Sequence, residues 1–353
     1  MTRRLTVFAL CALLCACGSD VGDRVGEAVD RVGEGVANGA DRLGDAATQL
    51  TGRLAEARDR ALEGLDRGVT RTRGQYLDPV PGTLSYEVTL PSHGLDRTVR
   101  IIQPEAPVAS APVLVVLHYS GGTNENMANL TRIGRLAADH GVWIVLPDGI
   151  GGQWNDDPAA PSSVDDIAFL DDVIAMMIAD APIDPSRITM AGMSNGGFMA
   201  ARYACERAES IAGFASVVGS MRNALAQACQ PTVPVPTLLV RGTSDLIVLY
   251  ARPPGMLSAQ DMFELWAGFN GCTGDVTVES LPDTVDDNTQ VELQRADGCV
   301  GAGDTRLYAV IGGGHAWPDI DPYTSITTLA LGRISREFAA TDLIWSFLEP
   351  LSR

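Results

Sequence analysis

Apolar and polar positions downstream of residue 75 alternate between two patterns. Short runs of consecutive apolar residues are typical of strands buried on both faces, and they occur at Pro112–Leu117, Val142–Leu146, Arg187–Met190 and Thr237–Val240. Helical spacing of apolar residues occurs in the intervals, at Asp165–Ile178, Gly197–Ala208 and Asp261–Asn270. Strands that alternate with helices predict an α/β fold with a mostly parallel central sheet and helices on both faces.

Two earlier segments have a different pattern. Apolar residues alternate with polar ones along Leu84–Leu90 and again along Thr98–Ile102. This alternation is typical of strands with one solvated face. The pattern therefore predicts an antiparallel hairpin that leads into the parallel sheet.

Residues 21–75 divide into five blocks of eleven. The first position of each block is apolar, at Val21, Val32, Leu43, Leu54 and Leu65. Eleven residues in three turns keep this stripe on one face of a nearly straight helix. The segment also contains ten Gly, which weaken a helix. We expect residues 17–75 to form a helical spacer, a tether without chemistry; a helix lying on a lipid surface or paired with another helix is the alternative.

The first residues have the pattern of an export signal. Arg3 and Arg4 precede the apolar stretch Leu5–Ala16, which is too short to span a bilayer and predicts a signal peptide over residues 1–16. The sequence Leu14-Cys15-Ala16-Cys17 resembles a bacterial lipobox, which implies a lipid anchor on Cys17. We expect a membrane-anchored lipoprotein that faces the periplasm or the cell exterior; with an ordinary signal cut near Ala16, the protein is secreted.

Cysteine usage agrees with export. Four of the seven Cys lie beyond the signal region, at Cys205, Cys229, Cys272 and Cys299. An even number in an oxidising compartment indicates two disulfides, for which three pairings exist. We favour the sequential pairing, Cys205–Cys229 and Cys272–Cys299, because it closes two short loops. Free buried thiols are the alternative.

A nucleophile motif occurs at Gly192-Met193-Ser194-Asn195-Gly196. It follows a predicted strand and opens a predicted helix, which is the context that a nucleophile elbow requires. The two glycines permit a tight turn that lifts the Ser194 hydroxyl above the sheet. Ser194 is therefore the predicted catalytic nucleophile.

A serine nucleophile needs a base and an orienting acid. The chain has four His, and His315 is the only one after Ser194, as the order Ser, acid, His requires. His93 and His140 suit surface roles, and His118 suits support of a loop. Asp245 follows the strand Thr237–Val240 and is the predicted acid, since it lies at the same edge of the sheet.

Backbone donors for a developing oxyanion are expected at two places. One is the N–H of Asn195, directly after the nucleophile. The other is the loop His118-Tyr119-Ser120-Gly121-Gly122-Thr123, in which Tyr119 and Ser120 are the candidates. A phosphate-binding role for this loop is excluded, because a P-loop needs a Lys and all 26 basic residues of the chain are Arg.

Together these motifs resemble the polyhydroxybutyrate depolymerase and feruloyl esterase-like family of secreted α/β-hydrolases. The resemblance rests on GMSNGG, on Val164–Ile174, on RGTSDLIVLY at Arg241–Tyr250 and on GGGHAWP at Gly312–Pro318, and it covers roughly residues 84–350. It implies a Ser194–Asp245–His315 triad, ester substrates, and no metal or organic cofactor. Many members have Gly where this chain has Tyr119, so we expect a narrower or more aromatic acyl pocket.

Two tryptophans lie near these motifs. Trp154 and Trp317 are candidates to line a substrate cleft, with ordinary packing as the alternative. Asp165 and Asp166 resemble the family's paired acids at a helix start, where capping and structural bonds are expected of them.

The whole chain carries a formal charge of −18, so a nucleic-acid partner is not expected. The surplus of acid lies in residues 76–353, with 15 Arg against 33 acidic residues, and it favours neutral substrates. The predicted function of this catalytic domain is exported serine ester hydrolysis through an acyl-enzyme, on a small or polymeric ester. A serine peptidase of prolyl-oligopeptidase type and a non-catalytic surface-binding lipoprotein are the alternatives.

Overall fold

The computed structural model describes residues 80–160, 162, 164–251, 255–320 and 331–353. The predicted signal peptide, Cys17, the eleven-residue repeats and the domain boundary before residue 76 lie outside these residues.

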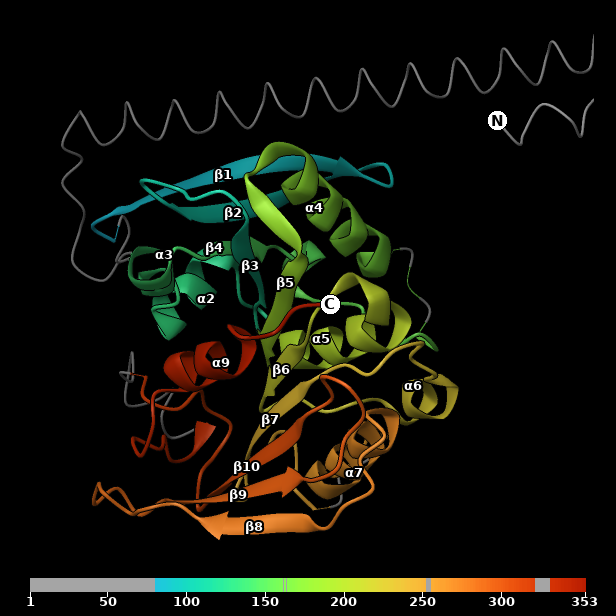
Figure 1. Cartoon of the computed structure of the whole chain (residues 1–353), viewed down its shortest axis with the longest axis vertical. Coiled ribbons are helices and arrows are strands. Elements are labelled where there is room, and N and C mark those ends of the chain that lie inside the picture. Colours follow the sequence, from blue (N-terminus) through green and yellow to red (C-terminus); the bar gives the residue numbers. More distant parts are fainter. Residues whose placement is uncertain (1–79, 161, 163, 252–254, 321–330) are drawn as a thin grey trace, which may run out of the picture. The chain divides into compact units, whose positions relative to one another are not determined.

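One mixed sheet runs through the described part of the chain (Figure 1). Its ten strands follow the spatial order β1-β2-β4-β3-β5-β6-β7-β10-β9-β8. Their bounds are β1 Thr83–Ser92, β2 Leu95–Pro104, β3 Ala111–Leu117, β4 Trp143–Pro147, β5 Ile183–Met193, β6 Phe214–Val217, β7 Thr237–Gly242, β8 Val276–Ser280, β9 Gln290–Ala296 and β10 Thr305–Ile311.

The centre of the sheet is parallel and its two edges are antiparallel. All pairings from β4 through β3, β5, β6 and β7 to β10 are parallel. These include the four buried strands that the apolar runs predict, and the predicted hairpin is β1 with β2. The antiparallel pair of β9 and β8 at the other edge was not predicted. Every residue of β8 is exposed, so the alternation of apolar and polar residues in it does not mark a buried face.

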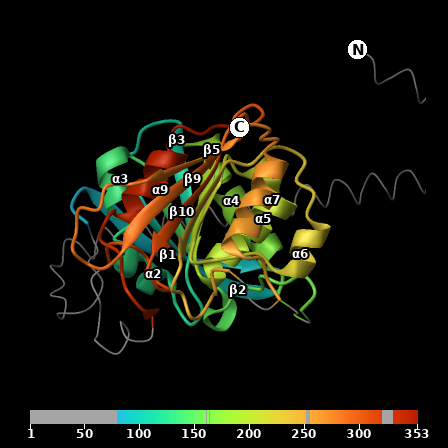
Figure 2. The same ribbon diagram turned by 90° about the horizontal axis from the view of Figure 1, so that it is seen from below.

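Helices cover both faces of this sheet. Figure 1 and the perpendicular view in Figure 2 show α2, α3 and α9 on one face and α4, α5, α6 and α7 on the other. Their bounds are α2 Asn124–Thr131, α3 Arg135–His140, α4 Asp166–Asp180, α5 Asn195–Glu206, α6 Asn223–Ala228, α7 Ala259–Phe269 and α9 Ala340–Leu348, with a short 3-10 turn at Ile150–Gly152. The three helices expected from apolar spacing are α4, α5 and α7.

The sheet is buried on both sides because its central strands are apolar throughout. All seven residues of β3 and all five of β4 are buried. Since β3, β5, β7 and β10 are parallel, their carboxyl ends meet at one edge, and the loops that follow them carry the predicted site residues.

Both expected disulfides are present. Cys205–Cys229 connects α5 to the end of α6, and Cys272–Cys299 connects the segment after α7 to the segment after β9. With sequence separations of 24 and 27, each bridge stabilises the fold by roughly 3 kcal/mol in the loop-entropy account.

No helix among the described residues is long and apolar enough to cross a membrane.

Candidate active site

Ser194 occupies a strained turn between β5 and α5. Its backbone has φ 52° and ψ −121°, a conformation that an L-residue adopts only where the surroundings impose it. The turn is so tight that a side chain at Gly192 would collide with the backbone of Gly196, and one at Gly196 with the Leu117 carbonyl. The two glycines thus allow the sharp turn that leaves the Ser194 side chain at the edge of the sheet.

Ser194, His315 and Asp245 form a connected chain of hydrogen bonds. The Ser194 Oγ lies 2.8 Å from Nε2 of His315, and Nδ1 of the same ring lies 2.7 Å from Oδ2 of Asp245. His315 and Asp245 are both buried, while Ser194 is partly exposed. The structure therefore brings together the three side chains that chain order predicts, with the hydroxyl on the accessible side.

The second oxygen of the Asp245 carboxylate is also engaged. Oδ1 accepts hydrogen bonds from the backbone N–H groups of Ile247 and Val248, each at 2.8 Å. The turn after β7 therefore holds this carboxylate in one orientation. Oδ2 is left to accept from the imidazole of His315.

Two backbone N–H groups beside Ser194 are available to a bound ligand. Within the described residues, neither the Asn195 N–H nor the Tyr119 N–H donates to another protein group. The plane of the Tyr119 amide is fixed from its far side, because the indole N–H of Trp154 donates to the His118 carbonyl at 3.0 Å. Since C=O and N–H point in opposite directions across a trans peptide, this bond orients the Tyr119 donor.

His118 supports the same loop as a neutral ring. Its Nδ1–H donates to the Tyr119 carbonyl at 2.8 Å, and its Nε2 accepts from the Gly149 N–H at 2.9 Å. Burial lowers the pKa of His118 below its usual range, which matches a ring that must keep one nitrogen unprotonated. The predicted loop-supporting role thus has a geometric basis, and the fixed Tyr119 carbonyl orients the N–H of Ser120 in turn.

The Asn195 side chain ties the nucleophile turn to Trp154. Its Oδ1 accepts from the Trp154 backbone N–H at 2.7 Å, and its Nδ2 donates to the Trp154 carbonyl at 3.1 Å and to Asp156 at 2.9 Å. A salt bridge of 2.7 Å from Arg222 to Asp156 extends the network. Both candidate oxyanion donors are therefore connected through Trp154.

A cavity of about 320 Å³ opens beside Ser194 and His315. Its wall is mostly apolar, with Tyr119 and Ser120 on one side and the side chains of Leu130, Met193, Ile247, Ile320 and Leu331 around it. Burial raises the pKa of the Tyr119 phenol, so this ring stays neutral at physiological pH. The cavity is suited to an uncharged group attached to the reacting carbonyl.

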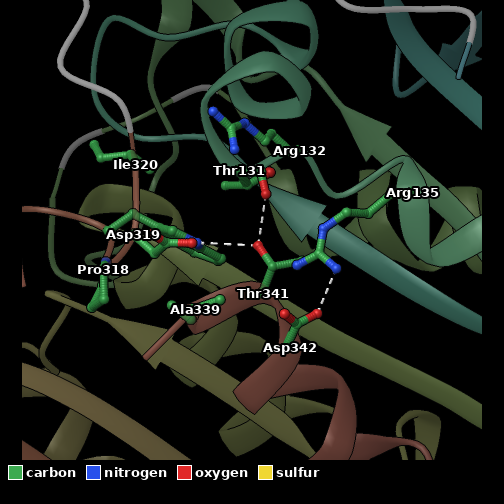
Figure 3. Close-up of a pocket in the computed structure, with 11 residues that line it drawn as sticks. Thr131, Arg132, Arg135, Pro318, Asp319, Ile320, Ala339, Thr341 and Asp342 are labelled. Carbon is green, nitrogen blue, oxygen red and sulfur yellow. Dashed lines mark hydrogen bonds and ion pairs between the residues drawn. The ribbon is translucent and has the colours of Figure 1, made fainter. Parts of the chain in front are cut away.

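The structure does not bring Trp154 and Trp317 to the wall of this cavity. The Trp154 ring is 3% exposed and lies beneath the oxyanion loop. Trp317 lines a second cavity of about 230 Å³, which shares Ile320 with the first; Figure 3 shows residues of its wall. Its indole N–H donates to the Thr341 hydroxyl at 3.3 Å. Both rings are packed and hydrogen-bonded, which is the alternative given for them from the sequence, and contact with a substrate stays a prediction.

The remaining polar candidates have structural roles. Asp165 caps α4 by accepting from the Ala168 N–H at 3.0 Å, and Asp166 pairs with Arg97 at 2.7 Å. The side chains of His93 and His140 are 56% and 38% exposed and lie away from the triad, as expected. No group of three potential metal ligands occurs in the part of the chain that the structure describes.

Comparison with known proteins places these features in context. The chain is 29% identical to feruloyl esterase B of Piromyces equi over 225 residues, which are 60% of this chain and 40% of that protein. It is 26% identical to the putative esterase NocK of Nocardia uniformis subsp. tsuyamanensis over 278 residues, which are 72% and 80% of the two chains. No family model matches.

Among solved structures, an acetyl xylan esterase from Aspergillus awamori superposes with a TM-score of 0.52 at 16% identity, over 66% of this chain and 94% of the other. The chain has an α/β-hydrolase fold. This confirms the fold predicted from alternating strands and helices. The esterase likeness is also present in the sequence relatives, whereas nothing among them singles out a polyhydroxybutyrate depolymerase.

Sequence reasoning missed residues that shape the site. Leu130, Ile320 and Leu331 line the cavity from segments that carry no motif. Arg241 belongs to the RGTSDLIVLY stretch, and its side chain is fully buried. An arginine inside an otherwise apolar strand is the one signal that points to it.

Proposed function

We propose that this protein is an exported carboxylic ester hydrolase that works through Ser194, His315 and Asp245. The observation that supports the proposal most is the unbroken chain from the Ser194 hydroxyl through His315 to Asp245, with contacts of 2.8 and 2.7 Å. The esterase relatives point in the same direction.

The first half of the reaction forms an acyl-enzyme. The Ser194 Oγ attacks the ester carbonyl carbon while Nε2 of His315 takes the hydroxyl proton. Asp245 holds the imidazole in the tautomer that can accept this proton and stabilises the imidazolium. When the tetrahedral intermediate collapses, the C–O bond to the alcohol breaks and the alcohol leaves with the proton from His315.

The second half releases the acid. A water molecule gives a proton to His315 and attacks the acyl carbon, and Ser194 leaves with that proton. In both halves the carbonyl oxygen becomes negatively charged. The N–H groups of Asn195 and Tyr119, with Ser120 in the same loop, donate to this oxygen.

The cavity favours a neutral, apolar group on the substrate. Its wall is largely aliphatic beside Tyr119, and the catalytic domain carries most of the acid of a chain with a net charge of −18, so an anionic substituent is repelled. Hydroxycinnamoyl, acetyl and hydroxyalkanoyl esters all meet this requirement. A panel of esters with increasing acyl bulk, together with a polymeric ester, separates them.

Substitution of the nucleophile tests the reaction. We expect Ser194→Ala to lower hydrolysis of a short p-nitrophenyl ester by about 10³-fold or more while the circular dichroism spectrum stays unchanged. Full activity in this variant would overturn the proposal. Assay of peptide substrates alongside the esters distinguishes a peptidase, and inertness toward all of them supports the non-catalytic alternative.

We also propose that the protein is anchored by a lipid on Cys17 after export. The two disulfides support an oxidising compartment. The wild-type protein is expected to partition into the detergent phase of a Triton X-114 extraction and Cys17→Ser into the aqueous phase. Equal partitioning of the two would favour a secreted form.

A further inference from the structure

Arg241 is a buried cation directly behind the catalytic acid. It lies in β7, and its whole side chain is excluded from solvent, with 0% exposure. Its Nη2 donates to the carbonyls of Val248 and Leu249, each at 3.2 Å. Its Nε and Nη1 are buried without a hydrogen-bond partner in the described part of the chain.

This arrangement is unfavourable for the fold taken alone. A buried charge with unsatisfied donors loses hydration that the protein does not replace, and an apolar side chain of similar volume is often as stable or more stable. Burial lowers the pKa of Arg241 to about 10, so the side chain is still protonated at neutral pH. Its presence therefore calls for a role other than stability.

The carbonyls that Arg241 binds belong to the turn that holds Asp245. The Val248 N–H donates to Asp245 Oδ1, and the Val248 carbonyl accepts from Arg241. The guanidinium thus holds the carbonyls of Val248 and Leu249. These belong to the two peptide groups that directly follow the two whose N–H groups bind the Asp245 carboxylate. Without this tie, the turn is free to move and Oδ2 loses its fixed direction toward His315.

Arg241 and Asp245 are also coupled by charge. Burial lowers the pKa of Arg241, and the Asp245 carboxylate partly opposes this by raising it. Glu292 of β9 lies on the same face of the sheet but is separated by Ala309 of β10.

We propose that Arg241 is a positioning residue for ester hydrolysis: it holds the 245–249 turn so that the Asp245 carboxylate meets the His315 imidazole. This inference rests on the proposed function, since it assigns Arg241 a role in the same triad.

Three substitutions separate position from charge. Arg241→Met removes both, Arg241→Lys keeps the charge without the two-carbonyl geometry, and Arg241→Gln keeps a donor without the charge. Arg306→Met is the matched control: Arg306 lies in β10, is paired with Asp304 at 2.6 Å and is remote from the triad. Thermal unfolding verifies that each variant is folded.

The readouts are ester hydrolysis and the rate of Ser194 labelling by a fluorophosphonate, both followed across the pH range. For Arg241→Met we expect kcat to fall about tenfold with KM changed less than about twofold. Labelling by the fluorophosphonate is expected to slow to the same degree, because both reactions use the Ser194 nucleophile. Arg241→Gln and Arg241→Lys each keep a donor and should lose less kcat than Arg241→Met.

Two outcomes overturn the inference. One is a wild-type kcat and a wild-type labelling rate in Arg241→Met, and the other is an equal loss of kcat in Arg306→Met. If wild-type protein is neither labelled nor active, the proposed function fails instead, so the two failures are distinguishable. Should Arg241→Met not fold, the Gln and Lys variants still decide between the outcomes.

Discussion

Among the residues that the structure describes, Arg97 and Arg241 are the buried arginines, and their surroundings differ. Arg97 of β2 donates to Asp166 at 2.7 Å and to the Asp148 carbonyl at 3.0 Å, and its guanidinium lies 3.8 Å from the centre of the Phe169 ring. Arg241 binds two carbonyls with one nitrogen, and its other two nitrogens have no partner among the described residues, whereas Arg97 lacks a partner only at Nε. Arg97 is paired with the Asp166 carboxylate, whereas the Asp245 carboxylate, which interacts with Arg241, is hydrogen-bonded to His315.

This difference assigns a structural role to Arg97 and agrees with the positioning role proposed for Arg241. The Arg97–Asp166 pair joins β2 to the start of α4, and Asp166 also accepts from the Asn155 N–H in the loop that supports Trp154. Removal of Arg97 therefore leaves a buried carboxylate with no counter-charge. Removal of Arg241 leaves Asp245 bonded to the His315 imidazole, so under the proposed function the loss is expected in turnover.

The largest expected effect is on stability. Arg97→Met leaves Asp166 buried without a cation and is expected to lower the free energy of unfolding by about 3–5 kcal/mol. Arg135→Met is the control, because its pair with Asp342 is 34% and 56% exposed (Figure 3) and is expected to contribute about 1 kcal/mol or less. Urea unfolding measures both variants. Equal losses of unfolding free energy in Arg97→Met and Arg135→Met would contradict the structural role assigned to buried Arg97.

The next effect is on turnover and concerns Trp154, which lies beside the Asn155 residue that Asp166 binds. Trp154→Phe removes the N–H that orients the Tyr119 amide, and we expect kcat to fall about 10- to 30-fold with KM little changed. Trp317→Phe removes a comparable indole bond, to Thr341, outside the catalytic cavity. It is expected to leave kcat unchanged. A larger loss of kcat in Trp317→Phe than in Trp154→Phe would instead support the substrate contact predicted for Trp317 from the sequence.

The smallest effect is a pH dependence of stability. Burial holds the pKa of His118 below its usual value of 6.5. Below pH 6.5, His118 is therefore protonated in the unfolded chain before it is protonated in the folded protein. The stabilising contribution of neutral His118 is complete above pH 6.5 and is lost as the pH falls through the lower folded-state value.

Urea unfolding at a series of pH values measures this contribution. We expect the wild-type protein to lose more stability on acidification than His118→Gln, which keeps an acceptor for the Gly149 N–H. Parallel pH dependences in the two proteins would show that His118 is not the group responsible.

Sequence patterns predicted what is local in this structure. The buried strands were found from their apolar runs, and Ser194, Asp245 and His315 from motifs that follow strands in a fixed order. The edge strand β8 was missed because all its residues are exposed. The short strand β6, with four residues, offers too few positions for a period to be visible.

What the sequence could not supply are contacts between distant segments. The bond from Trp154 to the His118 carbonyl spans 36 residues, and that from Asn195 to Trp154 spans 41. The sequence alone does not distinguish a tryptophan that lines a cleft from one that holds a loop in place. The burial of Arg241 depends likewise on the turn at residues 245–250, which folds back over its own strand.

The most direct test of the account is to find where a covalent inhibitor attaches. Purified full-length protein is treated with a fluorophosphonate, digested, and analysed by mass spectrometry. We predict a single phosphonyl adduct on Ser194, absent from Ser194→Ala and formed more slowly in Arg241→Met. An adduct on another serine, or none in an intact and folded protein, would contradict the assignment of Ser194 as the nucleophile.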